Sequence, residues 1–184
     1  MTDFVDELLC EHQEIRRVLN VVESQLDLLH ADDDPNWELL LDAMYYLTRY
    51  PDLFHHGFED VVFRQLHRRD AAAREFVQDL GREHGLLHEL GMAFLALCED
   101  VDAETMVPKD RLEHAGRCYV TAQQRHMRKE EQTVFPRIRH SLTEQDWLEV
   151  QHDLERLAQA RAGADTMSDQ FKLLHAHLMP ETEA

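Results

Sequence analysis

The sequence predicts an all-α fold, an up-down-up-down four-helix bundle with an additional C-terminal helix. Only 6 Gly and 5 Pro occur among the 184 residues, whereas Ala, Leu, Glu, Gln and Arg, which favour helices, are common. Four long amphipathic segments alternate with short polar breaks, and short connections favour antiparallel neighbours. We expect residues 1–140 to form the bundle, and residues 141–184 to form a helix and tail that pack on it or extend it.

The first two segments have clear boundary signals. The first covers residues 3–30 and stops at the sequence ADDDPN. Asp34 followed by Pro35 predicts the start of the second, with an N-cap and then proline at the first helical position. This segment runs to residue 69 and contains Pro51. A kink is expected there, because proline removes a backbone donor and crowds the preceding turn.

The later segments follow the same logic. The third covers residues 71–100, and Pro108 opens the fourth, which runs to residue 140. Thr143 and Asp146 resemble a capping box, which predicts a shorter fifth helix that ends near Gly163. A further short helix is predicted over residues 168–178 of the tail. The sequence contains no strand signal, repeat or low-complexity segment.

Composition excludes several classes of partner. The net charge is −18, from 37 acidic and 19 basic residues. No Lys/Arg cluster forms a face suited to nucleic acid or anionic lipid. No run approaches the roughly 18 apolar residues that a membrane span needs, and the acidic N-terminus does not resemble a signal peptide. Cys10, Cys98 and Cys118 form no CxxC pattern and are predicted to be buried thiols in a reducing compartment. We therefore expect a cytoplasmic protein.

Histidines and glutamates fall on the inward faces of the first two segments. The first segment has an a/d seam with His12 at one position; the seam consists of Val5, Leu8, His12, Ile15, Leu19, Val22, Leu26 and Leu29. In the second segment His55 and Glu59 share a face with apolar residues. His56 and Asp60 lie on a largely polar face, where we expect an exposed ion pair four residues apart.

The third and fourth segments repeat this arrangement. His84 and His88 lie four residues apart on a face that also carries apolar residues. His126 and Glu130 have the same spacing on the fourth segment. Glu131 is one position round the helix and is expected to be solvated.

Together these faces predict a metal centre inside the bundle. Buried ionised carboxylates without partners cost several kcal/mol each, so a cation must compensate them. The predicted ligands are His12, His55, Glu59, His84, His88, His126 and Glu130. Seven ligands exceed what one ion usually takes, so two ions bridged by Glu59 and Glu130 fit better. Imidazole with carboxylate suits iron, manganese or zinc.

The chain resembles the hemerythrin-like, or HHE cation-binding, family over about residues 3–140. The matching motifs are EH at 11–12, HHGFED at 55–60, EHGLLH at 83–88 and HMRKEE at 126–131. The resemblance implies a four-helix bundle around two non-haem iron ions with an oxo or hydroxo bridge.

In that resemblance His84, His88 and His126 hold one iron, His12 and His55 hold the other, and both glutamates bridge. It also implies a small ligand such as dioxygen, nitric oxide, peroxide or azide. Oxygen-carrying members have an aspartate five residues after the last ligand histidine. This chain instead has Glu130 four residues after His126, which leaves sensing, nitric-oxide chemistry or iron handling open.

Several functions remain open at this stage. The leading hypothesis is a di-iron protein that binds a small diatomic ligand for sensing, storage or scavenging. Alternatives are a di-iron enzyme that reduces nitric oxide or peroxide, and a metal-stabilised iron-handling or interaction module without redox turnover. A ferritin-like oxidase is excluded, because it needs two Glu-x-x-His motifs on separate helices and the chain has one, at 149–152.

Tyr119 is expected in the core or at an interface, with a hydrogen bond to bound oxygen as the alternative. The C-terminal segment is expected to cover a bundle end or to make a homodimer contact.

Overall fold

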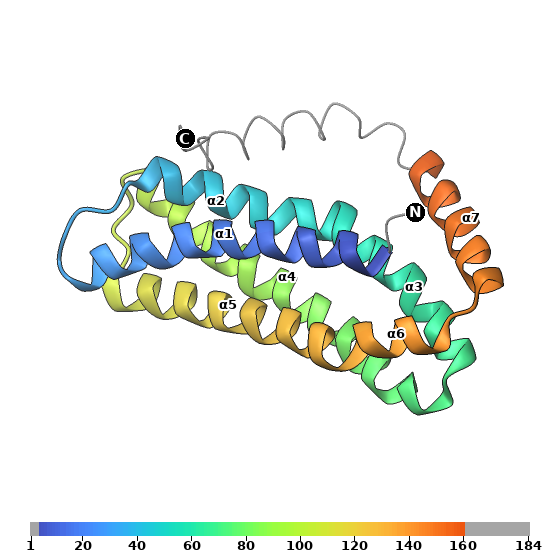
Figure 1. The fold of residues 1–184 in the computed structure, drawn as a ribbon. Helices are drawn as coiled ribbons and strands as arrows, with labels where there is room; N and C mark the ends of the chain where they lie inside the picture. The colour runs from blue at the N-terminus through green and yellow to red at the C-terminus, as the bar shows by residue number, and fades with distance from the viewer. Residues whose placement is uncertain (1–3, 161–184) are drawn as a thin grey trace, which may run out of the picture.

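The computed structural model describes residues 4–160, which are helical with no strand in that range (Figure 1). The elements in chain order are α1 (Phe4–His30), α2 (Trp37–Tyr50), η1 (Pro51–His55), α3 (His56–Arg69), η2 (Ala71–Ala73), α4 (Arg74–Asp102), α5 (Lys109–Lys129), η3 (Glu130–Val134), α6 (Phe135–Ser141) and α7 (Glu144–Ala160). The predicted all-α class is therefore confirmed. None of the described helices is both long and apolar enough to cross a membrane.

The predicted segments differ from the observed helices mainly at their starts. The second begins at Trp37, and its N-cap is Asn36, whose side chain accepts a hydrogen bond from the Leu39 amide. Asp34 is therefore not the cap, contrary to the prediction. The third begins with a 3₁₀ turn, in which Asp70 accepts from the Ala72 amide. The predicted helix over 168–178 lies outside the described residues.

Four long helices pack around a shared interior. Contacts join α1 to α2, α2 to α4, α4 to α5 and α5 to α1, and Figure 1 shows these helices side by side with α3, α6 and α7 gathered toward one end. Helices α1 and α5 approach closely at Gly116. A Cβ atom there would lie 2.8 Å from Leu26 and 2.7 Å from Phe94 of α4. Glycine suits this position because a methyl group would force the buried side chains of both neighbours to shift.

The apolar core consists of two clusters. The larger includes Ile15, Leu47, Phe94 and Met127. The smaller includes Leu8, Val62, Leu80 and Val134. Each long helical segment thus contributes to both clusters. The predicted metal ligands lie between these positions along the chain, or directly beside one in the case of His126, so apolar side chains flank that polar layer at both ends.

The predicted kink at Pro51 takes the form of a π turn. The segment Pro51–His55 is π-helical, and a π turn holds one residue more than an α-helical turn. Proline has no N–H to donate to the carbonyl of Leu47, four residues earlier. The Tyr119 hydroxyl of α5 donates to that carbonyl at 3.2 Å, and Gln123 donates to the hydroxyl oxygen. Tyr119 is 1% exposed and so belongs to the core, as expected.

Helix α7 packs on α3 through a buried carboxylate. Asp146 accepts from the amide and hydroxyl of Thr143, which is the predicted capping box. It also accepts from Gln65 and Arg69 of α3. Burial raises the pKa of Asp146, but these hydrogen bonds outweigh it and hold that pKa below its usual range. The domain division at residue 140 stays a prediction.

The cysteines differ from the prediction in two cases. Cys98 is buried, and burial raises the pKa of its thiol to about 12. Cys10 is exposed and Cys118 is partly exposed. The apolar spacing around those two did not distinguish the helix edge from the helix interior.

Replacing Tyr119 by phenylalanine is expected to lower the free energy of unfolding by about 1–3 kcal/mol, because the Leu47 carbonyl and the buried Gln123 amide both lose their hydrogen bonds to the hydroxyl. Tyr45→Phe is the matched control. Its hydroxyl donates to Glu99 at an exposed position, where changes usually stay within about 0.5 kcal/mol. Urea denaturation followed by circular dichroism measures both. Equal costs would show that the carbonyl does not depend on Tyr119.

Asp146→Asn is expected to weaken the packing of α7 at neutral pH. Because the pKa of Asp146 in the folded protein lies below its usual value of 3.8, the ionised carboxylate stabilises the fold above that pH. The contribution is lost as the pH falls through the folded pKa. The difference in unfolding free energy between wild type and variant should therefore shrink in acid. Fluorescence of Trp147, which packs on Phe4, reports it in a Trp37→Phe background. Asp153→Asn, which removes another carboxylate of the same helix, is the control.

Candidate metal centre

Two carboxylates form the middle of the site. Glu59 of α3 and Glu130 of η3 are both 0% exposed. All four of their oxygen atoms lack a hydrogen-bond partner among the described residues. Desolvating two carboxylates in this way costs several kcal/mol per group unless positive charge lies beside them. The surrounding residues must therefore supply that charge or hold a cation.

Histidine Nε2 atoms surround these carboxylates. The His12 Nε2 atom lies 3.4 Å from Glu130 and 3.7 Å from Glu59. His55 Nε2 lies 3.3 Å from Glu59, and His126 Nε2 lies 3.2 Å from Glu130. His84 Nε2 lies between the carboxylates, 3.6 Å from Glu59 and 3.7 Å from Glu130. The Nε2 atoms of the four rings thus converge on the two carboxylates.

The outer nitrogen of each of these rings faces another carboxylate. His12 Nδ1 lies 2.8 Å from Glu131, and His55 Nδ1 lies 2.6 Å from Glu11. His126 Nδ1 lies 3.1 Å from Glu83, and His84 Nδ1 lies 3.5 Å from Asp60. We call Glu11, Asp60, Glu83 and Glu131 the outer carboxylates. An ionised carboxylate only accepts, so Nδ1 carries a proton in each ring. A ring that has released its second proton, as metal binding requires, then has its lone pair on the inward Nε2.

The outer carboxylates connect the four helical segments in a closed circuit. Glu11 of α1 pairs with the histidine at the end of η1, and Asp60 of α3 pairs with the histidine of α4. Glu83 of α4 pairs with the histidine of α5, and Glu131 of η3 pairs with the histidine of α1. Each segment therefore orients a ring carried by the next, and the last orients the first.

Two cations hold the outer carboxylates in turn. Arg16 donates to Glu131, one turn along α1 from His12. Lys129 donates to Glu83 at 2.8 Å. The hydrogen bond from His126 and the charge of Lys129 lower the pKa of Glu83 to about 2, against the opposing effect of burial. Glu83 is thus ionised when it accepts from His126.

The protonation equilibria show that the centre attracts positive charge. Burial lowers the pKa of His12, yet Glu130 and Glu59 outweigh burial and raise it to about 9. Burial also lowers the pKa of His55, but Glu59 and Glu11 outweigh burial and raise it to about 10. Burial raises the pKa of Glu59, but the histidines hold it at about 2. The carboxylates stay ionised and stabilise any cation placed among them.

The donor atoms form two groups that fit metal ions. His56, Glu59, His84 and His126 have ligand atoms within 4.8 Å of one another, and so do His12, His55 and Glu59. Glu59 belongs to both groups, and Glu130 reaches histidines of both. The inner oxygens and two inward nitrogens have no hydrogen-bond partner in the described chain. Unpartnered donor atoms that converge in this way fit metal ligation by imidazole and carboxylate.

Two predicted orientations are wrong. His56 is 6% exposed and stacks on His84 with ring centroids 4.1 Å apart, so it does not face solvent. His88 is exposed and belongs to neither group of the described residues. Six of the seven predicted ligands converge, and His56 takes the place expected for His88.

Each error has a local cause. The inward face of the second segment was extended through Pro51 in α-helical register, whereas the π turn that ends at His55 adds a residue and shifts that register. Both adjacent histidines then reach the interior. On α4 the buried positions are Leu80, His84, Leu87, Gly91, Phe94, Leu95, Leu97 and Cys98, and all but Leu97 lie on one face. This face is centred on the side of His84 away from His88.

The outer carboxylates were missed as functional residues. Glu131 was expected to be solvated, yet it accepts from His12 and Arg16. Asp60 is exposed, as predicted, and its carboxylate faces His84. Their common signal is an acid directly beside an inward ligand. That signal is readable at Glu11–His12, Glu59–Asp60, Glu83–His84 and Glu130–Glu131.

A comparison with protein families agrees with a cation-binding centre. The model of the hemerythrin HHE cation-binding domain matches residues 3–138. Neither the curated proteins nor the solved structures that were compared with the chain gave a match.

His56→Ala is expected to remove at least one bound metal ion, because it deletes one of the nitrogens that converge on Glu59. His88→Ala is the matched control and should keep full metal content, since His88 is exposed. Elemental analysis of the purified variants gives the metal per chain. Loss from His88→Ala with retention by His56→Ala would contradict this placement.

Glu131→Gln is expected to weaken metal binding by about tenfold or more, since partners of the outer ring nitrogen typically contribute 10- to 100-fold. The amide keeps the size of the side chain but loses the charge that His12 and Arg16 share. Competition with a chelator measures the affinity. Glu89→Gln, an exposed change on α4, is the control. Equal affinities in the two variants would show that Glu131 does not orient His12.

Proposed function

We propose, because the chain belongs to the hemerythrin HHE cation-binding family, that it holds two non-haem iron ions and binds a small diatomic ligand there. The single observation that carries this proposal is the unpartnered pair of buried carboxylates among converging histidine nitrogens. One ion would be held by His56, His84 and His126, and the other by His12 and His55. Glu59 and Glu130 would be shared by both ions.

Iron is favoured over other metals by the type of donor. The centre offers imidazole nitrogen and carboxylate oxygen, and no thiolate takes part in either group. This mixture suits iron, and manganese or zinc less specifically. Two bound irons with an oxo or hydroxo bridge would supply redox chemistry toward dioxygen, nitric oxide or peroxide.

The surroundings of the centre support a small ligand in this proposal. The two apolar clusters flank the polar layer, so water is largely excluded around it. The histidines of the centre are at most 9% exposed, so an extended substrate would not reach them, and a diatomic molecule is a more suitable ligand. The outer carboxylates keep each ring in one tautomer with its lone pair inward. These features support ligand binding for sensing, storage or scavenging.

The bundle topology belongs to the same proposal. We infer an up-down-up-down four-helix bundle from the cyclic contacts of α1, α2, α4 and α5 and from their short connections. In this arrangement each segment has two neighbours, as the circuit of outer carboxylates requires. Helix α7 is additional to the bundle and packs against α3.

Protein produced in iron-supplemented medium is expected to contain two iron ions per chain, measured by elemental analysis. Anaerobic addition of nitric oxide to the reduced protein should then change its visible spectrum. Glu59→Gln is expected to lose both the iron and the spectral response, because Glu59 takes part in both groups. Glu89→Gln should keep both. A folded protein with two irons and no response to nitric oxide or dioxygen would favour the metal-stabilised module instead.

A further inference from the structure

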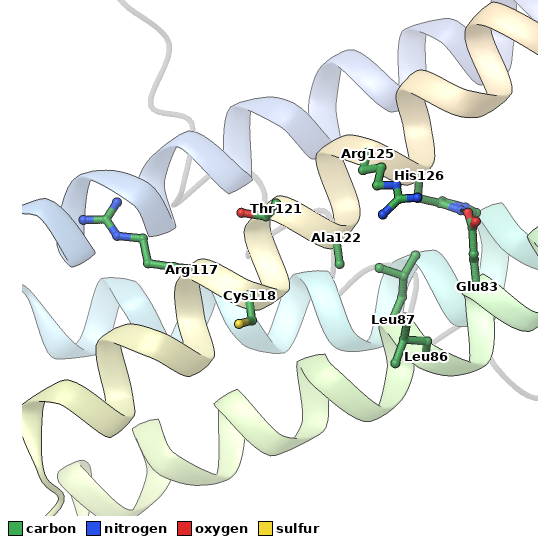
Figure 2. A pocket seen from close by; sticks show the side chains of 9 residues that line it. All are labelled: Glu83, Leu86, Leu87, Arg117, Cys118, Thr121, Ala122, Arg125 and His126. Carbon is green, nitrogen blue, oxygen red and sulfur yellow. Dashed lines mark hydrogen bonds and ion pairs between the residues drawn. The ribbon is translucent and has the colours of Figure 1, made fainter.

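A pocket of about 580 Å³ lies between α4 and α5, directly outside the metal centre. Its volume falls in the range of small-molecule sites, roughly 300–1,000 Å³. Glu83 and His126 form part of its wall. Figure 2 shows these two residues together at one end, with Arg117 toward the other. The pocket therefore borders the outer side of a histidine of the centre, and its occupant would sit beside the Glu83–His126 hydrogen bond.

The wall of the pocket is mainly apolar. Leu86 and Leu87 contribute from α4, and Ala122 contributes from α5. Leu86 is 51% exposed, although leucine gains about 25 cal/mol for each Å² of apolar surface removed from water. An apolar molecule in the pocket would cover this side chain. The small Ala122 leaves the space open, since a larger side chain at that position would occupy it.

Arg125 gives the pocket a cation that the protein does not neutralise. It lies at the same end as His126 (Figure 2). Arg125 makes no ion pair with any residue in the described part of the chain. Arg117, by contrast, donates to Asp27 and lies near Glu113. Glu83 is already satisfied by Lys129 and His126. An anion is therefore attracted to Arg125, even though the whole chain carries a net charge of −18.

We propose that this pocket binds a small organic carboxylate with an apolar body. The carboxylate pairs with Arg125, and the apolar body covers Leu86, Leu87 and Ala122. This proposal rests on the pocket alone and does not depend on which metal occupies the centre. The carboxylate would be a second ligand of the protein, chemically different from the diatomic molecule. It would lie beside Glu83, the residue that orients His126.

Isothermal titration calorimetry of the metal-loaded full chain with decanoate tests the proposal. Saturable binding of one decanoate per chain is expected, and decanol, which lacks the charge, should bind more weakly. Arg125→Gln should weaken binding of decanoate by about fivefold, the upper range for an exposed ion pair. Arg128→Gln removes an exposed arginine from the same helix outside the pocket and should leave the affinity unchanged.

Ala122→Phe fills the pocket and should abolish binding, and circular dichroism with metal analysis shows whether this variant keeps its fold. Leu86→Gln, at an exposed position, provides a second test that does not alter the interior and should also weaken binding. Binding that survives in Ala122→Phe would overturn the proposal. So would equal effects of Arg125→Gln and Arg128→Gln, or the absence of saturable binding. A concentration-dependent dimer with no decanoate binding would assign the apolar wall to a second copy instead.

Discussion

Two ionised carboxylates in the interior dominate the architecture. Glu59 and Glu130 are fully buried, and an isolated buried carboxylate would change its protonation state or destabilise the fold. The protein instead surrounds both with histidine nitrogens, and the pKa values of those histidines rise in response. Because the two carboxylates are stabilised by positive charge, the site also favours a bound cation. Both π turns carry residues of this site, since one ends at His55 and the other begins at Glu130. Such turns are frequent at functional sites.

The outer carboxylates extend this constraint to the whole set of helices. A single ring held from one side could rotate, but a ring held by a carboxylate outside and a shared carboxylate inside has one orientation. Because each outer carboxylate comes from a neighbouring segment, the centre and the helix packing specify each other. Pairing of one segment with the wrong neighbour would leave an imidazole without its outer partner. The polar layer therefore favours one order of helices, which the two apolar clusters alone specify less strictly.

Features that depend on an uninterrupted helix could be predicted from the sequence. Features that depend on a change of helical register could not. The seam of α1 from Val5 to Leu26 is buried as expected, with His12 among it, because an uninterrupted helix keeps its periodicity. Pro51 indicated a disruption of the helix but not its type, and after the π turn both His55 and His56 are buried. The prediction that His88 points inward was wrong for another reason. Residues four apart differ by about 40° around a helix, which is enough to move a side chain from the buried face of α4 to its exposed edge. The outer carboxylates could not be assigned because each acts on a ring from a different segment.

The two halves of the centre differ in how they meet the solvent. His12, His55 and Glu59 are at most 1% exposed, and Arg16 binds the outer carboxylate of His12. On the other side His84 is 9% exposed, and His126 forms part of the pocket between α4 and α5. Glu83 joins these features, since it lines the pocket and also orients His126. A molecule in the pocket would therefore contact the histidine of α5 and not those of α1 and η1. All four helical segments contribute to the centre, but the side of the centre that meets solvent and the pocket is formed mainly by α4 and α5.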